Sequence, residues 1–426
     1  MKNLNEKIIK EFSQGRKEPK WMLELRLESF RLFERMKLPE WGPDLSKVEL
    51  EKINFFSQEK IRPDQVVWQR LGLPEKERRY LSGLANQWNG KVVYQNLKSK
   101  LEKQGVVFEA MDEAVKKHPE LLRQYFMEIM PLDNKFSCLH GAVWSGGVFI
   151  YLPRGVKIRQ PIEGFFWLNN YHGGQFEHTI IVAGQDSELT YIEGCSAPRF
   201  QKEALHVGCV EVAVAKKAKV KLITLQNWSK NVLNLGMKRA EANEEGLVEW
   251  VGVNLGSQIT MSYPTSVLKG DRAKAEHLSL SMADKGQEIE SGGGAILIGK
   301  DTSANIVAKS ICLNGGISSY RGKGKIIKGA KGAKINVQCD SLILDDDSQA
   351  KTYPAIEIGE SESLALHEAK TGKINEEEMI YLMSRGLSEE QAISLIINGF
   401  IEPVVSQMPP EYAVEINKIM EMYAKR

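Results

Sequence analysis

The sequence lacks long apolar runs and paired cysteines, and these two absences set the first limits on its class. Nowhere do eighteen apolar residues follow one another, and residues 1–20 are polar and charged, so neither a membrane-spanning helix nor a secretory signal is predicted. The five cysteines are an odd set without a CxxC pair, which argues against a disulfide framework and a zinc finger. We therefore expect a cytoplasmic protein whose cysteines are free thiols or metal ligands.

Motifs for nucleotide binding and hydrolysis are also missing. The chain has no GxxxxGK[ST] phosphate loop, no GxGxxG after a strand, no GxSxG and no HExxH, so we do not expect it to hydrolyse ATP itself. The glycine run 292–294 lacks a following lysine and helix, and we interpret it as a tight turn. The 57 basic and 55 acidic residues nearly cancel, which gives no electrostatic reason to expect a nucleic-acid or membrane partner.

Both ends of the chain have a helical pattern. Residues 1–128 favour helix formers, with apolar residues at helical spacing between Trp21 and Met36, and predict a helical N-terminal domain. Residues 374–426 carry clear helix start and stop signals, such as Ser388 before two glutamates, and predict a helical C-terminal domain.

Residues 129–373 instead hold short β-rich runs separated by glycine and lysine. The separating residues, for example Gly155, Asp186 and Lys217, recur with an average spacing of roughly 29 residues, which is typical of a solenoid. Each coil of a parallel β-helix closes its apolar core by lying on the next coil. We predict a parallel β-helix core, with an antiparallel sandwich as the alternative.

The best candidate metal site lies near the end of this core. Cys339 is followed about one coil later by the adjacent pair His367 and Glu368, and thiolate, imidazole and carboxylate all bind iron. Adjacent coils lie about 4.8 Å apart, so these side chains are within reach of one metal centre. Core filler is the alternative interpretation of a Cys and His at this spacing.

Two further groups could carry chemistry. The carboxylate run 345–347 could form a calcium site, although a charged turn in solvent is the simpler interpretation. Cys195 lies in a glycine- and proline-containing turn beside a strand, where it could accept sulfur if Arg199 or Lys202 stabilises its thiolate. The alternative is a packed cysteine at a strand end.

Several motifs together give the chain a family resemblance. They occur in one order over nearly its whole length, and with them the chain resembles the SufB family of iron-sulfur cluster assembly proteins. The segments with the EGCSAP and QCDS sequences distinguish SufB from its paralogue SufD. The motifs are LPEWGPD (38–44), DNKF (133–136), AVWSGG (142–147), QFE (175–177), EGCSAP (193–198), QNW (226–228), QCDS (338–341), TYP (352–354), HEA (367–369), INGF (397–400) and EYAVE (411–415).

The resemblance implies an architecture and partners. It implies a mainly β fold, with a right-handed parallel β-helix core over 129–373 flanked by the helical domains 1–128 and 374–426. The C-terminal domain would dock a SufC-like ABC-type ATPase, and the chain would pair with a SufD-like subunit or a second SufB-like copy. The chain would then be a scaffold and not an enzyme, with ATP hydrolysed by its partner.

The same resemblance implies roles for individual residues. Cys339 would be the principal thiolate ligand of a nascent, transient iron-sulfur cluster, with Glu368 and His367 nearby and partner residues completing the site. Cys195 would receive sulfur from a cysteine desulfurase or sulfur carrier. A protected route is reasonable because exposed persulfide is readily oxidised or reduced. The positions that would line the route are Gln226, Trp228 and Lys238.

Two other functions remain open from the residues themselves. A β-helical polysaccharide-active enzyme could use the acidic run 345–347, and it would show activity on acidic glycans. A structural adaptor could recruit the ATPase without touching metal, and it would tolerate replacement of all five cysteines.

Overall fold

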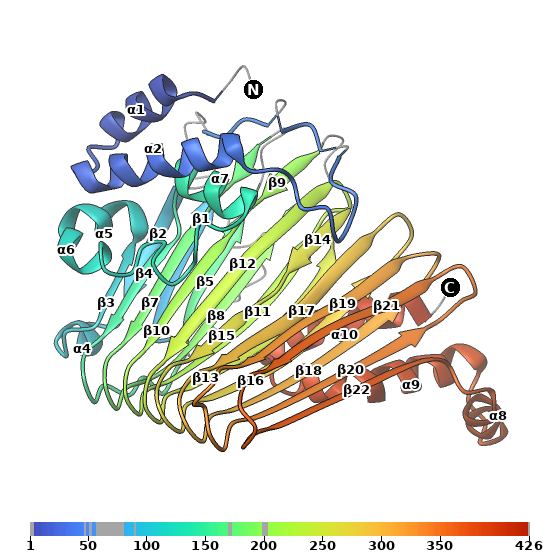
Figure 1. Ribbon diagram of the computed structural model, residues 1–426. Coiled ribbons are helices and arrows are strands. Elements are labelled where there is room, and N and C mark those ends of the chain that lie inside the picture. The colour runs from blue at the N-terminus through green and yellow to red at the C-terminus, as the bar shows by residue number, and fades with distance from the viewer. Residues whose placement is uncertain are drawn as a thin grey trace.

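The centre of the molecule is a parallel β-helix made of two facing sheets, with helices at both ends of the chain (Figure 1). The structure is a computed structural model that describes residues 4–46, 48–50, 53–56, 81–88, 91–168, 173–197 and 203–424. Within the β-helix the chain alternates between the sheets, and strands of successive coils pair in parallel. The predicted fold class, a mainly β protein with a parallel β-helix between terminal helices, is confirmed.

We call the two sheets sheet 1 and sheet 2. Antiparallel pairs occur only near the start in the described residues, between β1 and β2 and between β3 and β4. Sheet 1 contains, in chain order, β1 (Gly83–Trp88), β2 (Lys91–Leu97), β5 (Ile162–Trp167), β8 (Glu188–Ser196), β11 (Lys219–Trp228), β13 (Leu247–Gly256), β16 (Lys274–Ala283), β18 (Ser303–Cys312), β20 (Lys334–Ile343) and β22 (Leu364–Lys373). Sheet 2 contains β3 (Val107–Ala110), β4 (Val148–Leu152), β6 (Gly174–Gln175), β7 (His178–Ala183), β9 (Ala204–His206), β10 (Cys209–Val214), β12 (Val232–Ala242), β14 (Ile259–Ser262), β15 (Thr265–Leu268), β17 (Glu288–Leu297), β19 (Ile317–Ile326) and β21 (Gln349–Ile358).

Turn residues define the corners of the coils. A left-handed backbone conformation, which favours Gly, Asn and Asp, lets the chain reverse sharply between strands. The predicted separators Gly155, Asp186 and Lys217 all have positive φ angles. The regular spacing of these residues therefore does mark the coils.

The interpretation of residues 292–294 as a turn was wrong, because they lie inside strand β17. A Cβ atom at Gly292 would lie 1.7 Å from the carbonyl oxygen of Arg321 on the neighbouring strand. Glycine is needed there for close approach of two backbones and not for a reversal of the chain.

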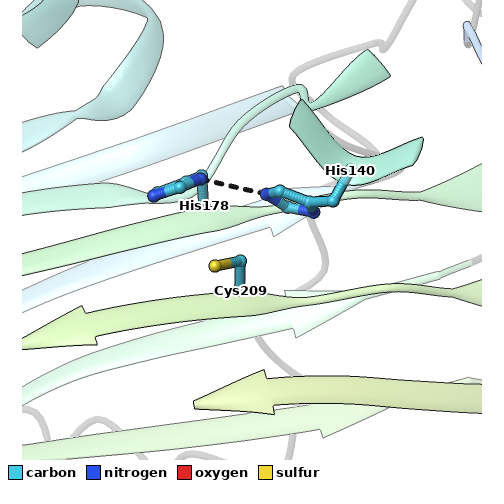
Figure 2. A group of neighbouring side chains, drawn as sticks. All are labelled: His140, His178 and Cys209. Atoms are coloured by element: carbon cyan, nitrogen blue, oxygen red, sulfur yellow. Dashed lines mark hydrogen bonds between the residues drawn. The ribbon is translucent and has the colours of Figure 1, made fainter. Parts of the chain in front are cut away.

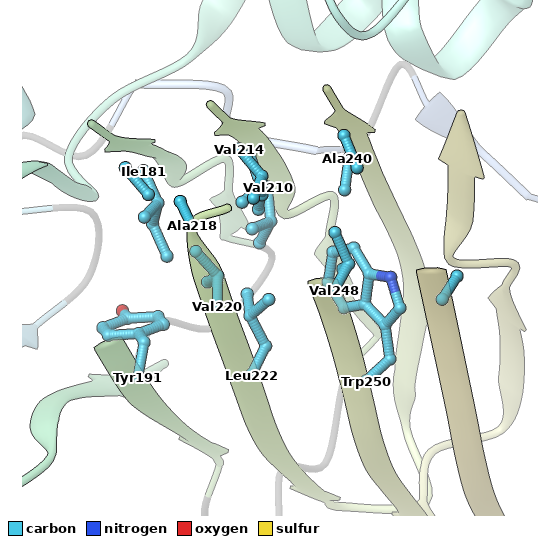
Figure 3. Close-up of a cluster of buried hydrophobic side chains, with 14 of the residues drawn as sticks. Ile181, Tyr191, Val210, Val214, Ala218, Val220, Leu222, Ala240, Val248 and Trp250 are labelled. Carbon is cyan, nitrogen blue, oxygen red and sulfur yellow. The ribbon is translucent and has the colours of Figure 1, made fainter. Parts of the chain in front are cut away.

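The space between the sheets, here called the lumen, contains a large cluster of buried apolar side chains. Ile181, Tyr191, Val210, Leu222 and Trp250 belong to this cluster (Figure 3). Because side chains alternate along a strand, every second residue of each coil points into the lumen. Each fully buried side chain of this kind contributes roughly 1.5–3 kcal/mol relative to its exposed state.

The N-terminal region combines helices with the strands β1, β2 and β3, so the structure of residues 1–128 is mixed where helices alone were predicted. Tertiary pairing explains the difference: β1 lies parallel to β5 and extends sheet 1. Residues 57–80, part of the predicted helical stretch, lie outside the described residues. The helices are α1 (Glu6–Gly15), α2 (Lys20–Arg35), α4 (Ser99–Glu102), α5 (Met111–Lys117), α6 (Pro119–Leu122) and α7 (Lys135–Val143).

The C-terminal helices are α8 (Glu376–Ser384), α9 (Glu389–Val405) and α10 (Pro410–Ala424), and the last two pack on the outer face of sheet 1. Ile397, Ile401 and Ile416 are buried there. The hydroxyl of Tyr412 donates a 2.7 Å hydrogen bond to Glu163 on β5. None of the helices in the described part of the chain is both long and apolar enough to cross a membrane.

Candidate functional site

A row of polar side chains follows one side of the lumen along sheet 1. Its members are register partners on successive strands, and they occupy the inward positions that alternate with the residues on the outer face. Two hydrogen bonds mark the row directly, from Ser310 to Ser341 at 2.8 Å and between Ser281 and Ser318 across the lumen at 3.2 Å. The polar row consists of Cys195, Gln226, Asn254, Ser281, Ser310 and Ser341.

Cys195 stands at the beginning of this row, on strand β8. Its sulfur, a carboxylate oxygen of Glu177 and a ring nitrogen of His206 all lie within 4.8 Å of one another. Beside them is a cavity of about 10 Å³, lined among others by Glu193 and Lys238, which is room for about one water molecule. The site therefore brings a thiol, two carboxylates, an imidazole and an ammonium group together in the interior.

Burial raises the pKa of the Cys195 thiol well above its usual value, and the carboxylates of Glu193 and Glu177 raise it further. The ammonium of Lys238 and a hydrogen bond from Gln226 act in the opposite direction without reversing the shift. Cys195 is thus a neutral thiol at rest. The two cations expected to activate it, at positions 199 and 202, lie outside the described residues.

Glu177 and His206 form a buried pair. Burial alone would raise the pKa of Glu177 and lower that of His206, but their mutual attraction reverses both effects, so the carboxyl pKa is lowered and the imidazole pKa is raised. The other ring nitrogen of His206 lies 2.7 Å from the side-chain oxygen of Asn234. Since an amide oxygen only accepts, that nitrogen carries a proton.

The three predicted route residues lie near Cys195. Gln226 is its register partner on β11 and accepts a 2.8 Å hydrogen bond from the indole of Trp228. Lys238, on the opposite sheet, donates a 3.0 Å hydrogen bond to Thr224. All three predicted residues are buried, and their polar groups are directed by these bonds.

Cys339 lies in the lumen near the other end of the row, on strand β20. Its sulfur is 3.9 Å from a ring nitrogen of His367 and 3.9 Å from the hydroxyl of Thr352. The thiol is buried, which raises its pKa, whereas His367 is exposed on the last strand of sheet 1. The structure therefore brings Cys339 and His367 together.

Glu368 has a different position from its neighbour. Its register partner is Gln338, whereas that of His367 is Val337, and adjacent residues of a strand face opposite sides of the sheet. The carboxylate of Glu368 lies 2.9 Å from the ammonium of Lys370 and is exposed. Glu368 is thus next to the Cys339 group along the chain but on the outer face of β22.

The acidic run 345–347 is a turn. Asp345 accepts hydrogen bonds from the backbone N–H groups of Asn314, Asp347 and Ser348 and from the Ser348 hydroxyl. These bonds occupy its carboxylate oxygens, as expected of a residue that stabilises a turn.

Glu177 and Glu193 lie in two of the motifs that carry the family resemblance, but no role was predicted for them or for His206. For Glu193 a signal was present, because it lies between Tyr191 and Cys195 in the alternation of strand β8 and thus at an inward position. A carboxylate at an inward position of an otherwise apolar strand is costly to bury and therefore indicates a site.

Comparison with known proteins identifies the family of the chain. Residues 166–400 match the model of the "SUF system FeS cluster assembly, SufBD core domain", and residues 82–163 match the "SufBD protein N-terminal region". Proteins described as iron-sulfur cluster assembly SufBD family proteins from Staphylococcus epidermidis, Staphylococcus haemolyticus and Staphylococcus aureus are each 43% identical over 431 residues, which covers 99% of this chain and 93% of the relative. The chain belongs to the SufBD family of iron-sulfur cluster assembly proteins.

Proposed function

We propose that this protein is a SufB-type scaffold, which receives sulfur at Cys195 and assembles a nascent iron-sulfur cluster at Cys339. The observation that carries the proposal is the polar row that runs from Cys195 to Ser341, which lies two residues from Cys339 on the same strand. Five strand spacings of about 4.8 Å separate β8 from β20, so the route would be about 24 Å long.

The interior of a β-helix suits such a route for a chemical reason. A persulfide exposed to solvent is readily oxidised, and thiols readily reduce it with release of its outer sulfur. Gln226, Asn254 and Ser281 are buried and supply hydrogen-bonding groups without exposing the path to bulk water. Lys238 adds a positive charge close to Cys195, which favours an anionic sulfur species there.

At the other end, Cys339 and His367 offer a thiolate and an imidazole to iron. Glu368 would join them only through a metal site shared with a partner, because its carboxylate is on the outer face of the last strand. Strands β21 and β22 form the final coil and are the last strands in the order of their sheets among the residues that the structure describes. This end is where we place a SufD-like subunit or a second copy of the chain.

We further propose that a SufC-like ATPase docks on the C-terminal helices and that this partner, not the scaffold, hydrolyses ATP. Helix α8 has no buried residue and exposes Ile380, Tyr381 and Met383. ATP binding by the partner would move the helices and open the Cys339 end to iron and sulfide. Such coupling requires two states that the nucleotide distinguishes. Alkylation of Cys339, measured with the ATPase present, should become faster on addition of ATP; an unchanged rate contradicts the coupling.

Anaerobic reconstitution with ferrous iron and sulfide tests the scaffold role. We expect stoichiometric iron and sulfide with visible charge-transfer bands in the wild type and in Cys312→Ala, a matched buried cysteine on the neighbouring strand β18. Cys339→Ala should lose the cluster. Absence of cluster in all three proteins, with the ATPase present, would favour the adaptor function instead.

A further inference from the structure

A second buried group of metal-ligating side chains lies outside the lumen, between sheet 2 and helix α7 (Figure 2). His178 on β7 and Cys209 on β10 are register partners on neighbouring strands, and His140 comes from α7. One ligand atom from each lies within 4.8 Å of the other two, and all three residues are fully buried. The proposed sulfur route uses none of them.

The hydrogen bonds around this group resemble the surroundings of a metal site. A histidine that binds a metal through one ring nitrogen usually donates the other N–H to a carbonyl or carboxylate. His140 Nδ1 is 2.8 Å from the carbonyl oxygen of Val207, and His178 Nε2 is 2.8 Å from Glu211 Oε2. Both imidazoles therefore have an outer partner of the required kind.

Glu211 is itself held in place. Its two oxygens accept hydrogen bonds of 2.7 to 2.9 Å from the backbone N–H groups of Met127, Ile129 and Met130. Phe126 stacks on His178 with 3.9 Å between ring centroids and closes another side of the group. The ligands are thus fixed by a buried and largely apolar surrounding.

The inner nitrogens face each other across the place where an ion would lie. His140 Nε2 and His178 Nδ1 are 3.0 Å apart (Figure 2). Because the Val207 carbonyl can only accept, His140 Nδ1 carries a proton and its Nε2 presents a lone pair. His178 Nδ1 must then donate to that lone pair, which leaves one proton shared between His178 Nε2 and Glu211. A single N–H hydrogen occupies the centre of the group.

We propose that His140, His178 and Cys209 bind one divalent thiophilic cation of the zinc(II) class. The ion replaces two protons, one from the Cys209 thiol and one from His178 Nδ1, and both leave to solvent. The proton shared with Glu211 stays on His178 Nε2, so the carboxylate is ionised. No electron is transferred.

The charge balance favours a divalent ion. A dication, one thiolate and one carboxylate sum to zero, which is the charge state that a fully buried site tolerates best. Two imidazoles and a thiolate are ligands for zinc and related metals, whereas magnesium and calcium prefer oxygen. Metal–nitrogen bonds of about 2.0–2.1 Å that meet at a near-tetrahedral angle need the two nitrogens a few tenths of an ångström further apart than they are now. A bound ion would tie helix α7 to sheet 2.

Cobalt(II) is the probe, because its spectrum reports thiolate ligation. The full-length chain carrying Cys195→Ser and Cys339→Ser, which removes the lumenal thiols, is expressed in cobalt-supplemented medium so that the buried site fills during folding. We expect about one cobalt per chain and a thiolate-to-cobalt charge-transfer band. Cys209→Ser in this background should lose the band and retain about tenfold less metal or worse after dialysis against a chelator. Cys138→Ser, a buried cysteine on α7 itself, should keep both.

A band that persists in folded Cys209→Ser protein, or that disappears in Cys138→Ser, would overturn the proposal. Because Cys209→Ser could fail to fold, X-ray absorption of the zinc-loaded background protein supplies a test without further substitution. We expect one sulfur at about 2.3 Å and two nitrogens at about 2.0–2.1 Å. A shell without sulfur, or no retained zinc, contradicts the site.

Discussion

Cys195 and Cys339 are buried to the same extent, 2% exposed each, but their surroundings differ. Around Cys195 the lumen holds two carboxylates, an imidazole and an ammonium group, and the coil has neighbours on both sides. Around Cys339 the thiol has polar contacts with Thr352 and His367, and the final strand is exposed. The polar row thus has two different ends along the axis of one β-helix. The end at Cys195, called the closed end, can protect sulfur, and the end near Cys339, called the open end, is one that a partner can reach.

The largest effect should come from changing the sulfur source in variants of the two ends. With desulfurase-generated sulfur, both Cys195→Ala and Cys339→Ala should lose cluster formation. With free sulfide, Cys195→Ala should recover the wild-type iron and sulfide content because sulfide can enter at the open end, whereas Cys339→Ala should not. Equal behaviour of the two variants with both sulfur sources would remove the distinction between the ends.

Replacing the lysine near each cysteine should give a smaller difference between the two ends. Lys238→Met removes the cation that opposes the raised pKa of Cys195, so we expect less thiolate, and persulfide formation about tenfold slower if the thiol pKa rises by about one. Lys309→Met removes a cation that pairs with Asp340 beside Cys339 and serves as the matched control. Mass spectrometry of the Cys195 peptide measures the rate. A similar loss in both variants would argue for a general charge effect.

Stability against pH tests the buried pair at the closed end. The pKa of His206 is raised in the folded protein. Its contribution to stability is therefore present below the pKa of the unfolded state and is lost as pH rises through the pKa of the folded state. The pKa of Glu177 is lowered, so its contribution is lost as pH falls through the folded value. Stabilisation by the pair is greatest between the unfolded-state pKa values of Glu177 and His206, at weakly acidic pH.

His206→Gln should therefore flatten the decline in melting temperature on the alkaline side. A difference of one between the folded and unfolded pKa values corresponds to about 1.4 kcal/mol of unfolding free energy. His277→Gln is the control, because burial lowers the pKa of His277 to about 3 and this residue stays neutral over the same range. An alkaline slope that His206→Gln leaves unchanged would contradict the charged pair.

The smallest effect on stability is expected at the open end. Leu366 on β22 is 53% exposed, so Leu366→Asp should change the free energy of unfolding by about 0.5 kcal/mol or less. If this face binds a second copy or a SufD-like subunit, light scattering should show loss of the complex. Val414→Asp, at 52% exposure on α10, should leave the pairing intact. If both variants keep the complex, the interface lies elsewhere.

The β-helix could be predicted because its determinants are local. Turn residues such as Asp186 and Lys217 recur at the spacing of one coil, and their left-handed conformations produce the corners. Strands β1 and β3 were missed because pairing with the distant strands β5 and β4 outweighs the helical tendency of the region.

The site was predictable in part. Cys195, Gln226, Trp228, Cys339 and His367 were identified through motifs. In the structure the first three lie together and the last two lie together, and the roles assigned to them stay predictions. The buried ligand group of α7 and sheet 2 was not predicted. Its three residues are distant in sequence, and they meet only because α7 covers two adjacent strands, which no local pattern discloses.

Transfer of sulfur along the lumen tests the central claim most directly. Asn254→Leu makes one member of the polar row apolar, and Asn227→Leu, on the opposite face of the neighbouring strand, is the control. A desulfurase supplies sulfur anaerobically, and mass spectrometry follows persulfide on the Cys195 and Cys339 peptides. We predict that sulfur reaches Cys339 in the wild type and in Asn227→Leu but stays on Cys195 in Asn254→Leu. Unimpaired arrival at Cys339 in Asn254→Leu, or arrival in Cys195→Ala, would contradict the lumenal route.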